Sequence, residues 1–559
     1  MPTLGMGLSI VRKFSFSYSS LISDFVDRVL LDGGIVDTTA YLNNTESTAT
    51  VIMNPSAYKD GILYSFKPND GTGDFTFTRG SAGTRVSKLG FLENVQTISS
   101  ELITNGDFSN GTTGWFFGSE WALVNETAVL TGSGTANSLG QTMTIVQGKT
   151  YKVEFDVLAM SVGAGKVQMQ QGLTNEFSGV GHKELYIDIV NTPFSAVSFA
   201  RKNSAINMTI DNVSIKEVTR ATDLPRITHE NFQYDGGGTL IPDSGIPALL
   251  MEDESTNLFL QSNDFVQSNW IHNSTLVMTG GYASPDGTLN AYNLAKVGGG
   301  SRIGQSVSLT SGLTYTFSFY MKNNGGAASL TATFGVQSVG QAYTITNDWV
   351  RYDFTFTATS TATSEMRMFS AVSDIDLLVF GAQLEQGTLS SYIPTTTATR
   401  TRLEDSCING GNSTLINSSE GILYLNIAPF GADNSKRAIS LNGGNDSDRL
   451  IIRYTTNNQI QVIFRAGSVN VVNQVMTLSN PLDFNQIAVS YKLNEFIIVV
   501  NGVQIGSTIT SGAVFGTTVN SLDFEEYNGL DKFRGKVLDG EYYDKAAETI
   551  AQLQTLTTQ

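Results

Sequence analysis

Residues 140–155 read GQTMTIVQGKTYKVEF, and residues 304–319 read GQSVSLTSGLTYTFSF. The two stretches align without a gap and share two glycines, a glutamine, a threonine, a tyrosine and a phenylalanine at equivalent positions. In both, polar and apolar residues alternate around the second glycine, which is the pattern of half-buried strands joined by a turn. This internal repeat predicts two copies of one β-structured module.

The repeat extends in both directions from these strands. Upstream, ITNGDFSNGTTGW (103–115) is similar to LQSNDFVQSNW (260–270). Downstream, IDNVSIKEV (210–218) is similar to VFGAQLEQG (379–387). Each copy therefore opens with Asp-Phe and a tryptophan and closes with an alternating strand, which fits a β-sandwich of jelly-roll type.

The rest of the chain is also read as β-structure. Strands separated by Asn-rich turns follow the second copy, and RLIIRYTT and QIQVIFRAG are predicted to meet as a hairpin at Asn457 and Asn458. The sequence KAAETIAQLQTL at the end predicts a short helix. The predicted organisation is an attachment or oligomerisation segment (1–50), a β-rich connector (51–100), jelly rolls at 101–218 and 256–400, a connector between them (219–255) and a third sandwich (408–559).

Composition excludes several classes of function. The net charge of -17 gives a surface that repels phosphate backbones, so we expect no nucleic-acid binding. The single cysteine, Cys407, cannot form an intrachain disulfide, and no apolar run is long enough to insert in a membrane. The three histidines lie far apart and show no zinc-ligand spacing. No catalytic motif is present and the modules leave no room for a catalytic domain, so we predict that the chain is not an enzyme.

The N-terminal segment differs from the rest. Leu21, Phe25 and Val29 have the spacing of one helical face, and Gly33 and Gly34 would end the helix. A helix this short needs a partner for its apolar face. Two interpretations stay open: the face packs on the next domain, or it attaches the protein to a larger particle. The first residues lack the pattern of a secretory signal, so we expect no export by that route.

Sugar binding is the functional hypothesis that the residue types favour. Aromatic rings stack on sugar C–H faces, while polar side chains bond the hydroxyl groups. Trp115 and Trp270 close the repeated opening motif and are predicted to lie in the cores. The other aromatic candidates for carbohydrate contact are Trp121, Trp349, Tyr282 and Tyr292.

The modules resemble known families. The hairpin IAVSYKLNEFIIVVNG (487–502) and the strand GKVLDGEYY (535–543) are similar to those of laminin-G-like, concanavalin-A-type sandwiches. The two repeated units resemble jelly-roll carbohydrate-binding modules. The resemblance implies an all-β chain of two jelly rolls plus one laminin-G-like sandwich, with a short N-terminal helical attachment segment. In these families a structural Ca²⁺ is common, and Asp107, Asp211 and Asp264 match its place; the alternative is an Asx-turn at each.

The order of motifs resembles the surface fibres of tailed bacteriophages. The motifs are FTRGSAGTRVSKLGFLENV, PRITHE, PALLMEDESTNLFLQSNDF and FGAQLEQGTLSSYIPTTTATRTRLED. This resemblance implies a structural head or tail fibre on the virion surface, assembled in the host cytoplasm. It also implies a homotrimer or dimer, contacts with capsid or tail proteins through the N-terminus (Leu21, Phe25 and Val29), and adhesion to host or environmental glycans. The alternative is a bacterial cell-surface adhesin or polysaccharide-binding protein.

Overall fold

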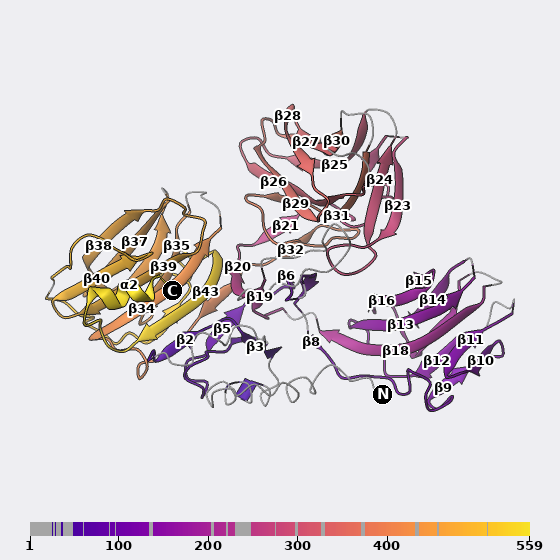
Figure 1. The fold of residues 1–559 in the computed structure, drawn as a ribbon, viewed down its shortest axis with the longest axis horizontal. Helices are drawn as coiled ribbons and strands as arrows, with labels where there is room; N and C mark the ends of the chain where they lie inside the picture. Colours follow the sequence, from indigo (N-terminus) through magenta and orange to yellow (C-terminus); the bar gives the residue numbers. More distant parts are fainter. Residues whose placement is uncertain are drawn as a thin grey trace. The chain divides into compact units, whose positions relative to one another are not determined.

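The computed structural model is almost entirely β-structure, as the sequence predicts (Figure 1). Of the first 47 residues it describes Phe25, Arg28, Val29, Ile35 and Val36. From residue 48 onward it describes the chain except 60, 89, 96, 133–137, 162, 203–205, 220–221, 230–246, 274, 297–299, 326–329, 371–374, 431–434, 456–457, 511 and 559.

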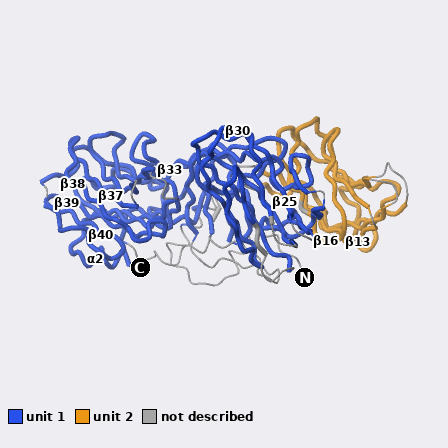
Figure 2. Tube along the Cα trace, turned by 90° about the horizontal axis from the view of Figure 1, so that it is seen from above, with its two compact units in different colours: residues 1–95, 222–559 blue, residues 96–221 orange. Residues whose placement is uncertain are grey.

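The chain divides into two compact units (Figure 2). One is the continuous segment Gln96–Ala221, which contains the first repeat copy; we call it the first sandwich. The other combines Met1–Val95 with Thr222–Gln559 and contains the second repeat copy and the C-terminal module. The first sandwich is therefore an insertion between two parts of one unit.

The first sandwich has two antiparallel sheets around its own apolar core. One sheet has the order β10-β11-β18-β13-β16, with β8 pairing at β18, and the other has the order β15-β14-β17-β12-β9. The strands are β8 (Thr97–Ile98), β9 (Trp115–Phe117), β10 (Trp121–Val124), β11 (Thr127–Leu130), β12 (Ser138–Thr142), β13 (Thr150–Met160), β14 (Gly165–Gln170), β15 (Leu173–Phe177), β16 (Gly181–Asp188), β17 (Pro193–Arg201) and β18 (Met208–Thr219).

The second sandwich repeats this plan with two five-stranded sheets. Their orders are β22-β25-β30-β27-β28 and β23-β24-β31-β26-β29. The strands are β22 (Ile271–His272), β23 (Val277–Tyr282), β24 (Ala291–Lys296), β25 (Ser301–Leu309), β26 (Thr314–Asn323), β27 (Leu330–Val336), β28 (Val339–Ile345), β29 (Val350–Thr357), β30 (Ala362–Ser370) and β31 (Ile375–Gln386).

The repeated residues have the same structural task in both copies. Gly148 and Gly312 turn the chain with φ values of +85° and +83°, a conformation that favours glycine. The hydroxyl groups of Tyr151 and Tyr315 accept backbone N–H hydrogen bonds from the loop before that glycine, at 3.0 and 3.1 Å. The repeated residues therefore set the same turn in both copies.

The repeated glutamine holds the opening segment of each sandwich. Gln141 exchanges two hydrogen bonds with the backbone of Thr104, at 2.8 and 2.9 Å. Gln305 makes the same pair with Leu260, at 2.8 and 3.0 Å. Both side chains are buried, so the amide replaces a missing strand neighbour for that backbone.

The third sandwich is built from the C-terminal module together with strands from both predicted connectors. One sheet has the order β19-β20-β43-β34-β39-β40-β41, with β2 pairing at β43, and the other has the order β38-β37-β36-β35-β42. The strands and helix are β2 (Val51–Met53), β19 (Arg226–Thr228), β20 (Ala248–Met251), β34 (Glu420–Pro429), β35 (Arg437–Asn442), β36 (Arg449–Thr455), β37 (Gln459–Ala466), β38 (Val469–Thr477), β39 (Asn485–Lys492), β40 (Glu495–Val500), β41 (Val503–Gln504), β42 (Ser521–Asp523), β43 (Gly535–Tyr543) and α2 (Ile550–Leu556). The predicted hairpin is β36–β37, and the predicted final helix is α2.

Smaller β-elements surround this sandwich. A sheet of order β1-β3-β4-β5-β33 joins the N-terminal region to the chain just before the third sandwich. There are two further strand pairs: β6–β7 lies just before the first sandwich in sequence, and β21–β32 joins the segments on either side of the second sandwich. The bounds are β1 (Ile35–Val36), β3 (Ala57–Lys59), β4 (Ile62–Leu63), β5 (Phe75–Thr78), β6 (Thr84–Val86), β7 (Leu92–Asn94), β21 (Ser255–Asn257), β32 (Arg400–Arg402) and β33 (Ser406–Ile408). Segments 51–100 and 219–255 thus supply structural strands where the sequence predicted connectors.

The predicted N-terminal attachment face is buried inside the chain. Phe25 and Val29 are helical in conformation and 0% exposed, packed with Ile52 and Phe66 in one apolar cluster. Leu21 lies outside the described residues. The structure corrects the attachment hypothesis for Phe25 and Val29, because side chains that fill an internal core are not free to contact a particle. Of the two interpretations left open, the packing one describes them.

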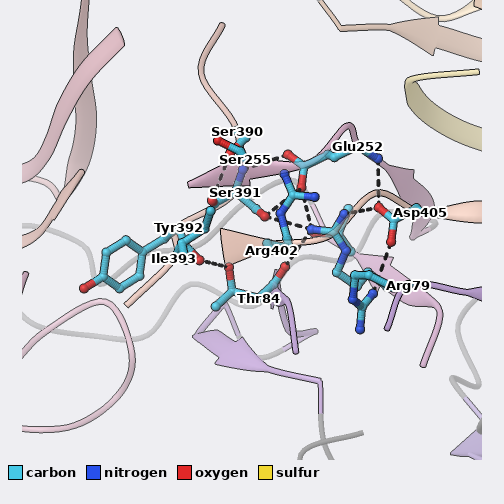
Figure 3. Close-up of polar contacts among 12 residues, drawn as sticks. Arg79, Thr84, Glu252, Ser255, Ser390, Ser391, Tyr392, Ile393, Arg402 and Asp405 are labelled. Atoms are coloured by element: carbon cyan, nitrogen blue, oxygen red, sulfur yellow. Dashed lines mark hydrogen bonds and ion pairs between the residues drawn. The ribbon is translucent and has the colours of Figure 1, made fainter. Parts of the chain in front are cut away.

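Five charged side chains meet where the second sandwich leaves and rejoins the rest of the chain, and we call them the junction cluster (Figure 3). They are Arg79, Arg226, Glu252, Arg402 and Asp405, each at most 4% exposed. Arg226 donates through Nη1 to Glu252 and through Nη2 to Asp405. Arg79 Nη1 donates to Asp405 Oδ1 at 3.2 Å, and Arg402 Nε lies 3.4 Å from Glu252 Oε2. Three guanidinium groups share two buried carboxylates.

The junction cluster fixes both ends of the second sandwich. Glu252 follows β20 and precedes the sandwich, while Asp405 follows it and precedes β33. The Glu252 N–H donates to the Asp405 carboxylate at 2.8 Å, and the Asp405 N–H donates to the Glu252 carbonyl at 2.9 Å. Ser391, at the exit of the sandwich, donates to Glu252 from its N–H and its hydroxyl, both at 2.7 Å. Each of the four motifs FTRGSAGTRVSKLGFLENV, PRITHE, PALLMEDESTNLFLQSNDF and FGAQLEQGTLSSYIPTTTATRTRLED therefore supplies at least one charged side chain to this junction.

Electrostatics keep the junction cluster ionised. Burial by itself would raise the pKa of Glu252, but the guanidinium groups of Arg402 and Arg226 and the hydrogen bond from Ser391 outweigh it and hold that pKa well below its usual range. Burial lowers the pKa of Arg79 to about 10, which still leaves it charged at pH 7. Glu252 and Arg79 are therefore both charged at neutral pH.

Removal of the central cation should destabilise the larger unit. We expect Arg226→Gln to lower the free energy of unfolding by about 3–5 kcal/mol, because it leaves buried carboxylates short of a partner. Thermal and denaturant unfolding measure this change. The control is Lys545→Ala, which breaks a 3.0 Å ion pair of a lysine whose side chain is 72% exposed and should cost at most about 1 kcal/mol. Equal losses in the two variants would contradict the role given to Arg226.

Stability should also depend on the ionisation of Glu252. Its pKa is lower in the folded chain than the value of 4.5 expected when unfolded, so its stabilising contribution is present above pH 4.5 and is lost as the pH falls below that. We expect the unfolding midpoint of the wild type to drop between pH 5 and about pH 3. The Glu252→Gln variant should start lower and lose less over this range. Parallel pH profiles of the two proteins would show that Glu252 is not responsible.

Candidate functional site

The two tryptophans predicted to contact carbohydrate are core residues. Trp121 is 5% exposed in the core of the first sandwich. Trp349 is 1% exposed and packs with Tyr320 and Tyr392. The structure corrects both assignments, because a ring enclosed by protein has no free face for a sugar. Trp115 and Trp270 were predicted to be buried, and they are 6% and 3% exposed.

The two predicted tyrosines are half-buried and already engaged. Tyr282 packs against the apolar cluster that contains Trp349. Tyr292 lies edge-on to Phe265 at 5.7 Å and donates its hydroxyl to Asp264 Oδ1 at 2.9 Å. Burial, and then this hydrogen bond, raise the pKa of Tyr292 to about 12. Both tyrosines therefore contact other side chains of the second sandwich.

The three aspartates proposed for calcium do not form one site. Asp107 accepts hydrogen bonds from the N–H and hydroxyl of Ser109, at 3.3 and 3.0 Å, which is an Asx-turn. Burial raises the pKa of Asp211, with smaller contributions from neighbouring carboxylates that include Asp107. Asp264 is bonded to Tyr292 and Gln267 in the other sandwich. Within the described parts of the chain no three acidic, histidine or cysteine side chains are grouped so that they could hold a metal ion.

A hollow beside the junction cluster is too small to enclose a sugar. It has a volume of about 160 Å³ and lies between Asp253, Ser390 and Arg534 beside the junction cluster. Pockets that enclose small ligands usually measure about 300–1,000 Å³. Arg534 also pairs with Asp253 and Glu404, so the hollow is a gap in an ion-pair network. A second hollow, of about 500 Å³, lies in the third sandwich beside Pro429, Leu482 and Lys536 and is within that range.

One sheet of the second sandwich is covered on its outer side. Tyr320, Leu378 and Phe380 alternate with the core residues of β26 and β31 and so point outward. They pack under Leu92 of β7 and under Tyr392 of the exit segment. We call β23-β24-β31-β26-β29 the covered sheet.

The opposite sheet, β22-β25-β30-β27-β28, is the open sheet. Among the described elements, the main contacts of its strands are with one another and with β26 and β29 of the same sandwich. Met366 and Met368 of β30 face the core. The residue after each of them, Arg367 and Phe369, therefore points outward. Its outer face is therefore the available surface of the second sandwich.

A strip of small residues crosses this outer face. In the register of the sheet, Arg367 stands opposite Gly304 on one side and Gly335 on the other. Gly335 in turn faces Gly340, and Gly304 faces Ile271. The other members of this row are three glycines and the apolar Ile271. Arg367 is therefore its only long polar side chain.

The glycines let Phe369 and Arg367 lie close to the sheet. A Cβ at Gly335 would be 3.1 Å from Phe369 Cε1, and a Cβ at Gly304 would be 3.1 Å from Arg367 Cβ. The Arg367 guanidinium carbon lies 5.5 Å from the centroid of the Phe369 ring, a cation–π distance. The half-buried ring therefore lies close to Gly335, and the Arg367 guanidinium lies over the ring, so the two side chains form one aromatic and cationic group on this face.

An ion pair lies on the same face as the Phe369 ring. Arg302 Nε lies 3.2 Å from Glu365 Oε1, although Arg302 stands opposite Phe369 and Glu365 opposite Ser306. The Arg302 side chain reaches Glu365 by passing Gly304, which has no side chain to block it. The face thus offers an aromatic ring and charged groups together.

The first sandwich has diverged at the same place. Its row reads Phe116, Gly140, Ser198 and Gln168, so a serine stands where the second sandwich has Arg367. Phe116 is 65% exposed and occupies the place of Ile271. The two copies share a scaffold and differ in the chemistry of this face.

Sequence reasoning missed Phe369 and Arg367 because it searched for the large aromatic residues near the repeated motifs. The alternation in MRMFS (366–370) does carry the signal, since two methionines facing one way place arginine and phenylalanine on the other. The sequence gives no sign of which of the two sheets is covered by β7.

The sequence profile of a family described as a carbohydrate binding domain matches residues 269–372. This range starts at Asn269, one residue before Trp270, and ends two residues after β30, so it includes Arg367 and Phe369. No curated protein matches the sequence. No helix among the described residues is long and apolar enough to cross a membrane.

Several solved structures are similar to parts of the chain. The CBM40 of the Ruminococcus gnavus IT-sialidase, bound to α2,3-sialyllactose, is 14% identical and covers 27% of this chain and 93% of its own, with a TM-score of 0.23. The N-terminal CBM22 tandem domain of Xyn10C from Paenibacillus barcinonensis is 11% identical and covers 52% and 98%, with a TM-score of 0.19. Domains LG4-5 of the mouse laminin α1 chain are 6% identical and cover 44% and 89%, with a TM-score of 0.19.

Proposed function

We propose that this chain is a glycan-binding display protein and that the open sheet of its second sandwich contacts the sugar. The observation that carries the proposal is the coincidence of two findings on the same strands. The carbohydrate-binding profile matches residues 269–372, and the outer face of those strands presents Phe369 and Arg367 on a strip of glycines.

The chemistry of this face suits a sugar ring. One side of a pyranose presents C–H groups that pack on an aromatic ring, and burial of that contact removes apolar area from water. The guanidinium of Arg367 and the Arg302–Glu365 pair can exchange hydrogen bonds with ring hydroxyl groups. The surface is shallow, so a single contact is expected to be weak, and several copies on one particle or cell would raise the apparent affinity.

The glycan proposal requires a measurable interaction that depends on Phe369. We expect affinity electrophoresis with xylan, mixed-linkage glucan, laminarin or polygalacturonate to retard the wild type on at least one polysaccharide. Phe369→Ala should weaken that interaction by about 2 kcal/mol, or roughly 30-fold, as truncation of a central aromatic contact does.

The control is Leu289→Ala, which removes a 58% exposed apolar side chain from a loop outside the open sheet. It should bind as the wild type does. Retardation that survives Phe369→Ala would place the binding site elsewhere on the chain, and no retardation on any acidic or neutral polysaccharide would refute the proposal.

For the carrier of this binding activity we propose a surface fibre of a tailed-bacteriophage particle, on the head or the tail. The support is the order of four sequence motifs along the chain, which includes the residues of the junction cluster. A bacterial cell-surface polysaccharide-binding protein is the alternative, and it fits the carbohydrate-binding profile equally well.

Electron microscopy of particles from the source distinguishes the two carriers. Antibody fragments raised against residues 408–559 should label capsid or tail if the virion proposal holds. Label on bacterial cell envelopes and none on particles would favour the polysaccharide-binding alternative.

A further inference from the structure

We propose that the open sheet selects a sugar that carries a carboxylate, such as a hexuronate, and that Arg367 is the residue that recognises it. This inference rests on the proposed function, because it names the class of glycan for the same face. Three observations carry it: the lack of an acidic partner for Arg367, the local sign of the charge, and the divergence of the two sandwiches.

Arg367 has no carboxylate partner among the described residues. The neighbouring arginine on the same face, Arg302, is paired with Glu365 at 3.2 Å. Arg367 contacts the Phe369 ring instead, at 5.5 Å from its centroid. A guanidinium group presents a planar set of N–H donors that fits a carboxylate with two parallel hydrogen bonds. The Arg367 guanidinium is therefore not paired with an acidic side chain of the described residues.

The local charge is opposite to that of the whole chain. The chain carries -17, which repels anions at long range. On the outer face of the open sheet two arginines stand against one glutamate, which leaves one excess positive charge. This excess lies beside the aromatic ring, so an anionic sugar that stacks on Phe369 would place its carboxylate next to Arg367.

The first sandwich gives an internal comparison. Ser198 occupies the register position of Arg367, and Ala200 occupies that of Phe369. The glycine on the strand next to the edge is kept in both copies, as Gly140 and Gly304. The scaffold is therefore shared, while the ring and the cation are specific to the second sandwich. Anion selectivity should belong to the second sandwich alone.

The test compares one ligand in two charge states on the full chain. A short oligogalacturonate and its fully methyl-esterified form have the same sugar rings, but only the first carries carboxylates. Isothermal titration should show tighter binding of the acid form by the wild type. Arg367→Ser, which installs the residue found in the first sandwich, should raise the Kd for the acid form roughly 10- to 100-fold. It should change the Kd for the ester by no more than about threefold.

Two further variants separate charge from surface shape. Arg367→Lys keeps the charge but loses the paired donors, so it should bind the acid form with intermediate affinity. Ser198→Arg in the first sandwich adds a cation without the neighbouring ring and should leave both Kd values unchanged. Thermal melting checks that each variant is folded.

The outcomes separate the inference from the proposed function. Equal binding of acid and ester, unchanged by Arg367→Ser but lost in Phe369→Ala, would overturn the anionic preference and leave glycan binding in place. A preference for the acid that survives Arg367→Ser would overturn the assignment to Arg367. Absence of binding to both forms and to the polysaccharide panel would overturn the proposed function and this inference with it.

Discussion

The buried contact of Arg226 with Glu252 and Asp405 is the constraint on which the arrangement of the larger unit depends. Charges removed from water are costly unless each is paired and hydrogen-bonded. Arg226 can meet that requirement only if the strand before the second sandwich and the segment after it lie side by side. A folded chain must therefore bring both ends of that sandwich to one place, and backbone hydrogen bonds between Glu252 and Asp405 complete the closure.

Closure at this point decides which surface of the second sandwich is free. The exit segment passes through Ser391 and Tyr392, and Tyr392 packs on the outer side of the covered sheet together with Leu92. That sheet becomes part of an internal interface, and its aromatic residues, Trp349 included, become core residues. The open sheet keeps an outer face on which Arg367 and Phe369 are half-buried beside two glycines. Structure and proposed recognition thus lie on opposite sides of the same sandwich.

The residues that sequence analysis interpreted well are those whose task is local. The repeated Gly148 and Gly312 set a turn, and the alternation around them sets strand faces, so the all-β sandwiches follow from the pattern itself. The burial of Trp349 depends on packing by β7, which is distant in sequence, and no local pattern records it. In the same way, the connector segments gain strands β2 and β20 only through pairing with β43. The sequence motifs that contain Arg79, Arg226, Glu252 and Asp405 lie far apart along the chain, and only the fold shows that their charged side chains form one junction.

The account places glycan recognition on the open sheet and structural closure on the covered one. Hydrogen–deuterium exchange of the full chain, with and without a saturating oligosaccharide that binds it, tests this division most directly. The account predicts slower exchange on ligand addition in peptides that cover β25, β27 and β30, and unchanged exchange in the equivalent strands β12, β14 and β17 of the first sandwich. Protection confined to the first or third sandwich, with none in β30, would contradict it.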